Sequence, residues 1–427
     1  MMKARPCLAL TFLFLLGSCT SPDVLELEQS PVTGPAGEWP QWRGPQRDGR
    51  VPAQGLLQEW REGAEPRQVW RRQLGEGFSS VTVAGGRAFT LFADDSREYL
   101  IALEARDGSE LWRLDLGRKH LDGNGHGPRS TPLASEGVVY ALSARAKLVA
   151  ARIQDGKLLW QLDIRQRFSR GEDPAWGYSS SPLLEGGLLL IHGAQTGNVL
   201  ALDRSSGQLV WSAEYGPVGY SSPIVARLAG RRQVVSLIGT LLVGLDLDSG
   251  RRLWSHPWRT FSAVNVGDPI PLGSDQVFIS SGYNQGAALL RIRPAGKEGG
   301  LAVEEVWASR VMRNHFNSSV AVGGYLYGFD NASLKCVRAA DGRKMWAKRG
   351  LGKGSLIAAG HQLIVLGARG RLVLAEATPE EYRERGSIQV LTGVCWTPPT
   401  LAGQWLYLRN QREIVCLNLG VLKTAVP

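Results

Sequence analysis

Short apolar runs alternate with turn residues along most of the chain. Residues 180–211, SSPLLEGGLLLIHGAQTGNVLALDRSSGQLVW, hold short runs of this kind, which are broken at 186–187, 195–198 and 205–207. Clusters of Gly, Asn and Ser of this kind are typical of tight turns between strands. The pattern therefore predicts short antiparallel β-strands. No stretch shows a helical period over ten or more residues, and the nearest, 377–386, is expected to form a loop or one helical turn.

A second pattern repeats on a larger scale. The hexapeptide DGSELW at 107–112 returns in altered form as DGKLLW, SGQLVW, SGRRLW and DGRKMW. Its tryptophan recurs, with two further copies, at spacings of 39 to 53 residues, as Trp70, Trp112, Trp160, Trp211, Trp254, Trp307 and Trp346. Small polar pairs before apolar runs mark eight unit starts. Several short strands in each unit of this length are typical of a β-propeller, in which neighbouring blades cover each other's faces.

One column of the repeat holds only small residues, five positions before the Asp or Ser of the turn. Its members are Ala102, Ala150, Ala201, Gly244 and Cys336, and in the last unit Cys416 aligns with them. A position that stays small is expected where one sheet packs closely on the next. Cys336 and Cys416 are therefore interpreted as small apolar packing residues.

The two ends of the repeat region complement each other. The eighth unit, 395–419, has three predicted strands and lacks the outer strand with its tryptophan. The chain begins with an unpaired strand of that kind, QVWRRQL at 68–74. We therefore predict an all-β, eight-bladed β-propeller over residues 39–420, closed by an N-terminal strand that completes the last blade and hides its edge. Residues 421–427 are left as a tail.

The repeat resembles a known superfamily. The motif Ala-x-Asp-x-x-Ser-Gly-x-x-x-Trp is intact at Ala201, Asp203, Ser206, Gly207 and Trp211, and it is similar to the tryptophan-docking motif of eight-bladed quinoprotein (PQQ) propellers. The segment EWPQWRGPQRDGR at 38–50 resembles the opening of exported bacterial PQQ-like repeat proteins. The resemblance implies that the seven repeated tryptophans pin outer strands between blades and do no chemistry. Because the turn before Trp307 is lengthened, this tryptophan is expected to have a longer approach.

The N-terminus predicts export. Residues 1–18 have a basic start and a short apolar run, and small residues then precede Cys19, which resembles the lipobox of bacterial lipoproteins. The hypothesis is a signal peptide at 1–18, a lipid on Cys19 and a Pro- and acid-rich disordered tether at 19–38. Thr20 favours the outer membrane, with the protein facing the periplasm. The formal charge of +10 suits anionic envelope partners, whereas nucleic acid is a poor candidate for an exported protein.

Candidate binding residues lie in the loops that enter first strands and join second to third strands, which meet on one face around the central shaft. The predicted ligand-binding mouth consists of Asn124, Arg129, Trp176, Tyr178, Asn265, Asp268, Tyr283, Asn284, Asn314 and Trp396. An aromatic and amide-rich mouth suits a flat or sugar-like ligand. The alternative is an ordinary polar propeller mouth that holds only water.

The chemistry of PQQ enzymes has weak support in this chain. The resemblance implies a quinone held against a disulfide between adjacent cysteines, with a calcium ion bound by Glu, Asn and Asp. The sequence has no adjacent cysteine pair, and Asn265 with Asp268 is only a hint of a calcium site. No cofactor or metal is therefore expected, and PQQ with calcium stays as the alternative. Whether Cys395 and Cys416 form a disulfide is left open.

Two functional hypotheses follow. The first is a non-enzymatic lipoprotein of the cell envelope, a propeller scaffold that binds protein or glycan partners and touches the membrane through its lipid. Its analogue is the propeller lipoprotein of the outer-membrane β-barrel assembly machinery, which this chain resembles more distantly. The second is a periplasmic PQQ-dependent dehydrogenase for an alcohol or sugar. The fold alone does not separate them, since one fold hosts many functions.

Overall fold

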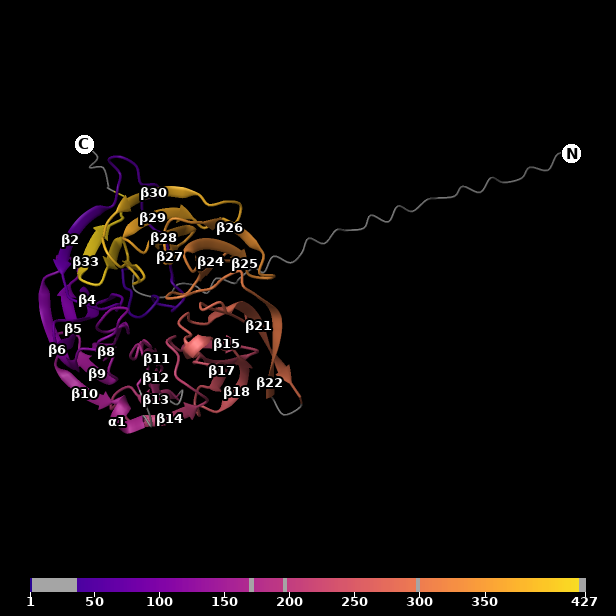
Figure 1. Ribbon diagram of the computed structural model, residues 1–427, viewed down its shortest axis with the longest axis horizontal. Helices are drawn as coiled ribbons and strands as arrows, with labels where there is room; N and C mark the ends of the chain where they lie inside the picture. The colour runs from indigo at the N-terminus through magenta and orange to yellow at the C-terminus, as the bar shows by residue number, and fades with distance from the viewer. Residues whose placement is uncertain (2–36, 169–172, 195–197, 297–299, 422–427) are drawn as a thin grey trace.

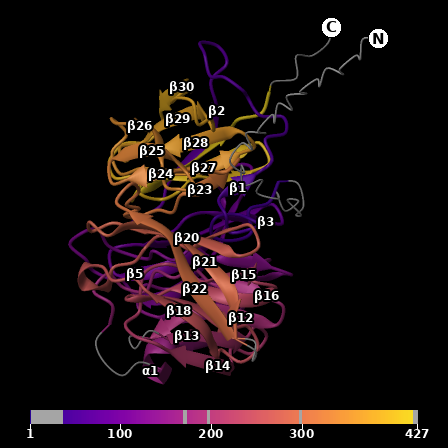
Figure 2. The same ribbon diagram turned by 90° about the vertical axis from the view of Figure 1, so that its right-hand side faces the viewer.

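The computed structural model describes Met1 and residues 37–168, 173–194, 198–296 and 300–421. Most of the predicted signal peptide and tether, with Cys19, lie outside these described residues, and so does most of the tail. The described chain forms eight antiparallel sheets that stand around a central axis (Figure 1). The predicted eight-bladed β-propeller is confirmed. In the side view, the long strands β21 (Gly286–Ala295) and β22 (Gly300–Ser309) face the viewer (Figure 2).

Each blade is a meander whose first strand lies innermost and whose last strand lies outermost. Blades 1 to 4 consist of β3 (Thr82–Ala84), β4 (Arg87–Ala93), β5 (Arg97–Glu104) and β6 (Glu110–Arg118); β7 (Leu133–Ser135), β8 (Val138–Leu142), β9 (Lys147–Arg152) and β10 (Leu158–Asp163); β11 (Leu183–Glu185), β12 (Leu188–Ala194), β13 (Asn198–Asp203) and β14 (Leu209–Glu214); and β15 (Ile224–Leu228), β16 (Arg231–Leu237), β17 (Leu241–Asp246) and β18 (Arg252–Pro257).

Blades 5 to 7 consist of β19 (Ile270–Leu272), β20 (Gln276–Ser281), β21 (Gly286–Ala295) and β22 (Gly300–Ser309); β23 (Val320–Val322), β24 (Tyr325–Asp330), β25 (Ser333–Arg338) and β26 (Lys344–Lys348); and β27 (Ser355–Ala359), β28 (Gln362–Leu366), β29 (Arg371–Glu376) and β30 (Glu384–Gln389). Two short helices, α1 (Ile164–Phe168) and the 3-10 helix η1 (Phe261–Ala263), follow β10 and β18. Of the segment 377–386, residues 377–383 form a loop, as expected, whereas residues 384–386 already belong to β30.

The ring closes as the sequence predicts. Blade 8 joins β31 (Thr400–Ala402), β32 (Trp405–Arg409) and β33 (Glu413–Asn418) to β2 (Arg67–Gln73), which pairs antiparallel with β33. Arg409, with 1% of its surface exposed, locks this seam to blade 1. Its guanidinium donates to the carbonyl oxygens of Ser79 at 3.1 Å and Leu91 at 2.8 Å. The buried charge is thus satisfied by backbone acceptors of the neighbouring blade.

The small-residue column lies directly opposite the repeated tryptophans. Ala102 pairs with Trp112, Ala201 with Trp211 and Cys416 with Trp70 across the two outer strands of their blades. A small side chain there leaves room for the indole to lie across the sheet. Cys336, Cys395 and Cys416 are buried free thiols, so the question of a disulfide between Cys395 and Cys416 is answered in favour of packing.

Most of the repeated tryptophans dock on the next blade. The indole Nε1 of Trp70, Trp112, Trp160, Trp211, Trp307 and Trp346 donates to a backbone carbonyl in the loop between the two outer strands of that blade, at 2.7–3.0 Å. The glycine of the repeat lies under the ring from the preceding blade. Gly250, for example, has a φ of +69°, and a Cβ there would meet the ring of Trp211. The glycine and the tryptophan of one motif therefore belong to two different contacts.

The longer approach expected for Trp307 is confirmed, because β22 begins seven residues before this tryptophan, at Gly300. Its Nε1 donates to the Ala339 carbonyl at 2.9 Å, as in the regular units. The irregular contact lies one blade earlier, at Trp254, whose indole donates to Gln233 Oε1 within its own blade. The reason is geometric, because each tryptophan docks on the turn of the following unit and not on its own.

An N-terminal segment fills the shaft, which the sequence did not predict. Residues 38–51, named the plug here, begin beside the β3–β4 turn, where the Gly85 N–H donates to Glu38. Trp39 exchanges two backbone hydrogen bonds with Val83, each 2.9 Å long. The plug ends as β1 (Arg50–Val51), which pairs parallel with β27 and gives blade 7 a fifth, innermost strand. The plug thus enters from the face of the β3–β4 turn and pairs with the first strands of two blades.

Candidate functional site

A cavity of about 210 Å³ opens where the loops that enter the first strands meet around the shaft. It is lined by Trp42, Phe78, Asn124, Arg129, Trp176, Ser179, Ser181, Tyr220, Ser222, Val264, Val266, Asp268, Tyr283, His315, Phe316, Asn317, Trp396 and Pro398. Six of the ten residues of the predicted mouth are therefore brought together, namely Asn124, Arg129, Trp176, Asp268, Tyr283 and Trp396. Their role in binding stays a prediction.

The other four predicted residues do not line this cavity. Tyr178, Asn265 and Asn314 are buried in the surrounding loops, and Asn284 lies in the β20–β21 turn with a φ of 64°. The Asn265 Nδ2 donates to the Ile238 carbonyl at 2.9 Å. The Asn314 Nδ2 donates to the Phe329 carbonyl at 3.1 Å. These two amides hold loop backbone in place, a common use of buried Asn in irregular segments.

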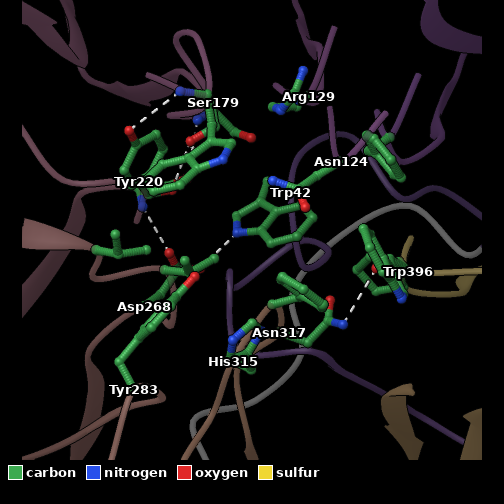
Figure 3. Close-up of a pocket in the computed structure, with 18 residues that line it drawn as sticks. Trp42, Asn124, Arg129, Ser179, Tyr220, Asp268, Tyr283, His315, Asn317 and Trp396 are labelled. Atoms are coloured by element: carbon green, nitrogen blue, oxygen red, sulfur yellow. Dashed lines mark hydrogen bonds between the residues drawn. The ribbon is translucent and has the colours of Figure 1, made fainter. Parts of the chain in front are cut away.

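Trp42, at the tip of the plug, forms the floor of the pocket. Figure 3 shows its indole among the labelled residues, with the ring nitrogen directed at Asp268. The second oxygen of Asp268 accepts the Ser222 N–H at 2.7 Å, and Arg43 Nε lies 3.9 Å from the same carboxylate. The floor is therefore fixed by a buried carboxylate whose two oxygens are both engaged.

Two buried arginines hold the plug under Trp42. Arg43 donates to the Ser319 carbonyl at 2.8 Å, and Arg47 donates to the Pro182 carbonyl at 2.8 Å. Burial lowers the pKa of both guanidinium groups, that of Arg47 to about 10, while the charge of Asp268 opposes the shift. Both arginines stay charged at neutral pH, and their carbonyl partners come from two separate blades, 6 and 3.

Stacked rings form one side of the pocket wall. Trp396 lies between Phe78 and Phe316, with ring centroids 5.5 and 4.3 Å away. The chain of rings continues from Phe316 to His315 at 4.1 Å and from His315 to Tyr283 at 4.7 Å. Such contacts restrain every ring in the series. The wall is therefore rigid and largely apolar.

The opposite side of the pocket is more polar. Trp176 and Tyr220 meet edge to face at 5.5 Å, and burial raises the pKa of the Tyr220 phenol to about 12. Arg129 donates to Asp122 at 2.7 Å and to the Gly127 carbonyl at 2.6 Å. Its charge is thus neutralised by the neighbouring loop before any ligand binds.

Two polar groups of the wall have unused hydrogen-bonding capacity. Asn317 is 7% exposed and donates to the carbonyls of Gly354 and Trp396, yet its Oδ1 has no partner among the described residues. The His315 Nδ1 is likewise without a partner in that part of the chain. Burial and, secondarily, the charge of Lys353 lower the pKa of His315 to about 4. His315 is therefore neutral near pH 7.

The residues present do not fit PQQ held with calcium. Within the described ranges, no group of three or more His, Cys, Asp or Glu residues could hold a metal ion. Asp268, the carboxylate in the cavity lining, is already engaged by Trp42 and Ser222. Hard cations such as calcium need six to eight oxygen ligands, and this pocket does not assemble them.

Some residues that line the cavity were not in the predicted mouth, and the sequence marks them to different degrees. Trp42 lies in the opening segment EWPQWRGPQRDGR, which the sequence analysis singled out but did not place in the shaft. Phe78 and Phe316 stand beside the small polar pairs that mark unit starts. Their positions next to those marks could have suggested them, because the pocket is built from the segments just before the first strands.

Comparisons with known proteins agree with the fold. The family model described as outer membrane protein assembly factor BamB matches residues 62–175 and 96–348, together more than half of the chain. BamB from Moraxella catarrhalis is 15% identical, with a TM-score of 0.57 over 83% of this chain and 99% of that one. No curated protein sequence matches the chain.

Quinohemoprotein alcohol dehydrogenases are also structurally similar. ADHIIG from Pseudomonas putida HK5 is 12% identical, with a TM-score of 0.62 over 92% of this chain and 81% of that one. The enzyme from Comamonas testosteroni is 13% identical, with a TM-score of 0.59 over 92% and 82%. At these identities the likeness concerns the fold, which is shared by a family of assembly factors and a family of enzymes.

Proposed function

This chain belongs to the family described as outer membrane protein assembly factor BamB, and we propose that it is a non-enzymatic scaffold of the bacterial cell envelope. In this proposal its pocket face, formed by the loops around Trp42, receives a protein or glycan partner. No step of catalysis is assigned to any residue. The family description, the predicted export signal and the chemistry of the pocket support the proposal from three directions.

The proposed location is the periplasmic side of the outer membrane, with a lipid on Cys19 as the membrane contact. The sequence around Cys19 and the description of the family support this location. No helix in the described part of the chain is long and apolar enough to span a membrane. Because the plug enters beside the β3–β4 turn, opposite the pocket, a tether at that end would leave the pocket face free for a partner.

The observation that carries the proposal is the state of the pocket's charged groups. Asp268 is engaged by the plug, and Arg129 is paired with Asp122. A general acid or base needs a proton that can be exchanged with a substrate within hydrogen-bonding distance, and these groups are already committed to the protein itself. A rigid recess with aromatic walls and neutralised charges suits binding better than chemistry.

A photo-crosslinking amino acid placed on each face tests the proposal. Asn124 is exposed and lines the pocket, whereas Arg106 is exposed in the β5–β6 turn on the opposite face. In cells that make the protein, we expect discrete adducts from position 124 and none from position 106. Equal labelling at both positions, or no adduct at either, would contradict the assignment of this face.

The alternative function, PQQ-dependent oxidation of an alcohol or sugar, has its support in the structural likeness to quinohemoprotein alcohol dehydrogenases. It requires that purified protein with PQQ and calcium acquires a bound chromophore and oxidises alcohols with a dye as electron acceptor. Absence of binding at micromolar PQQ would remove this alternative. Saturable binding with turnover would instead overturn the scaffold proposal.

A further inference from the structure

We infer that the pocket binds one neutral pyranose ring of a glycan, stacked on Trp42 and hydrogen-bonded to Asn317. The inference deepens the proposed function, on which it rests for the biological setting, by naming the chemistry of the ligand. It depends on four features of the site: a free aromatic face, an unused acceptor, neutralised charges and a small volume.

The free aromatic face belongs to Trp42. Trp396 is covered on both sides by Phe78 and Phe316 and presents no open face of its own. No aromatic ring contact among the described residues involves Trp42, although it lines the cavity and its ring nitrogen is held by Asp268. The C–H faces of a pyranose pack on an indole held in this way, because an aromatic ring offers a large apolar surface with negative charge on its face.

The unused acceptor is Asn317 Oδ1. The Asn317 amide is oriented by two hydrogen bonds from Nδ2, each 3.2 Å long, to the carbonyls of Gly354 and Trp396. A buried acceptor without a partner is unfavourable, and because this oxygen is covered in the empty pocket, a ligand donor reaches it when neighbouring side chains of the wall shift. A sugar hydroxyl or an acetamido N–H supplies that donor while the ring stays on the indole. Asn124 at the exposed rim offers a second amide.

The charged side chains of the pocket are already paired, which favours a neutral ligand ring over a charged one. Arg129 donates to Asp122 and to two backbone carbonyls, and both oxygens of Asp268 accept protein N–H groups. His315 is neutral near pH 7. Lys353 Nζ lies 5.2 Å from the Phe316 ring centroid but does not line the cavity. A flat polycarboxylate would therefore find no uncommitted cation in the wall, whereas a neutral ring needs none.

The volume selects a single ring. Sites for drug-sized ligands occupy about 300–1,000 Å³, and this cavity has about 210 Å³. A single sugar ring suits this space, with the rest of a glycan leaving through the open mouth.

Calorimetric titration of the purified full chain with N,N′-diacetylchitobiose and with cellobiose tests the inference. At least one disaccharide is expected to bind, with a change in tryptophan fluorescence. Asn317→Leu should weaken that binding about tenfold, the equivalent of one hydrogen bond. Asn124→Ala, at an exposed position, should weaken it about threefold, and the control Gln161→Ala on the outer strand β10 should leave it unchanged. If Asn317→Leu fails to fold, Asn124→Ala and Gln161→Ala still test the site.

Lack of binding for both sugars at about 10 mM, tenfold above a millimolar Kd, overturns the inference. So does binding of N-acetyltryptophanamide without either sugar, because the pocket would then take an aromatic side chain. Neither outcome affects the crosslinking contrast between positions 124 and 106. Failure of the glycan inference is thus distinguishable from failure of the scaffold proposal.

Discussion

Two neighbouring junctions of the ring are held together differently. Between blades 3 and 4, Trp211 donates to the Leu247 carbonyl at 3.0 Å and its ring lies on Gly250. Between blades 4 and 5, Trp254 donates to Gln233 and lies on Gly244, both in its own blade. The first tryptophan therefore bonds across the junction, whereas the second bonds within its sheet.

The difference goes with the length of the outer strands of blade 5. The regular turn after β17 holds a glycine with positive φ and an open carbonyl, and Trp211 uses both. Strands β21 and β22 of blade 5 are ten residues each, longer than their counterparts β17 and β18. An inner contact bridges this junction instead, because Trp258 Nε1 donates to Ser281 Oγ of blade 5 at 3.0 Å. Outer docking is thus one of two means of fastening blades.

The largest effect is expected from Trp211→Ala. Removal of a buried aromatic side chain costs about 3–5 kcal/mol of unfolding free energy, and it also breaks the bond to Leu247. Urea denaturation followed by circular dichroism measures the loss. Ligand binding by the pocket should be unchanged in the folded variant, because Trp211 lies on the outer wall. A nearly neutral effect would contradict the docking role.

Glycine substitutions sharpen the same comparison. Gly250→Ala places a Cβ against the ring of Trp211 at a φ of +69°, and we expect it to cost about 2–3 kcal/mol from overpacking and backbone strain. Gly244→Ala should be coupled to Trp254 instead. In double-mutant cycles, we expect Gly250→Ala to cost less unfolding free energy only when Trp211 is already removed. Gly244→Ala should likewise cost less only when Trp254 is removed. Coupling of Gly250→Ala to Trp254 would be evidence against the two assignments.

The features of the fold that could be predicted from the sequence are those that depend on residues close together in the chain. Turn glycines and short apolar runs act within a few residues, so the eight blades and the closing strand follow from the pattern alone. The irregular contact of Trp254 was not predicted, because the contact of each motif lies in the next unit. Trp42 could not be placed, since the plug has no strand period and its partners Asp268 and Ser319 are more than two hundred residues away.

The mouth was predictable only as a region. Placing the loops that enter first strands on one face follows from the blade meander, and six of the ten predicted residues do meet there. Whether an Asn in such a loop faces the cavity or bonds to its own backbone depends on tertiary contacts. Asn317 and Asn265 illustrate the two outcomes, because Asn317 keeps a free oxygen at the wall while the Asn265 amide holds neighbouring loop backbone.

The junction of blades 3 and 4 is also expected to make the stability of the protein depend on pH. At the junction of blades 3 and 4, buried His192 bonds to Ser236 through Nε2, and burial lowers its pKa from 6.5 to about 3. Between these two pKa values His192 is protonated in the unfolded chain but not in the folded chain. The contribution of His192 to the free energy of unfolding is therefore fully present above pH 6.5 and is lost as the pH decreases toward 3. Between pH 7 and 5 the loss is about 2 kcal/mol.

Urea midpoints of the native chain and of His192→Gln measure this contribution. The variant should lose stability at pH 7 but show a shallower decline toward pH 5. The difference between the two slopes isolates His192 from the other histidines. Parallel slopes would show that His192 takes up its proton in the folded state as readily as in the unfolded state.

The smallest effect is expected at the inner contact of blades 4 and 5. Trp258→Phe keeps most of the buried ring but removes the N–H that reaches Ser281 Oγ. Because Ser281 Oγ still donates to Asn265 Oδ1 at 2.7 Å, no buried group of the serine is left without a partner. The cost should be about 1 kcal/mol of unfolding free energy, that of one ordinary hydrogen bond.

Thermal denaturation compares this loss with that of Ser281→Ala. Ser281→Ala removes both hydrogen bonds and leaves Asn265 Oδ1 without this donor, so it should cost more. A larger loss from Trp258→Phe than from Ser281→Ala would mean that the indole holds this junction by packing, as Trp211 does, and the contrast between the two junctions would then disappear.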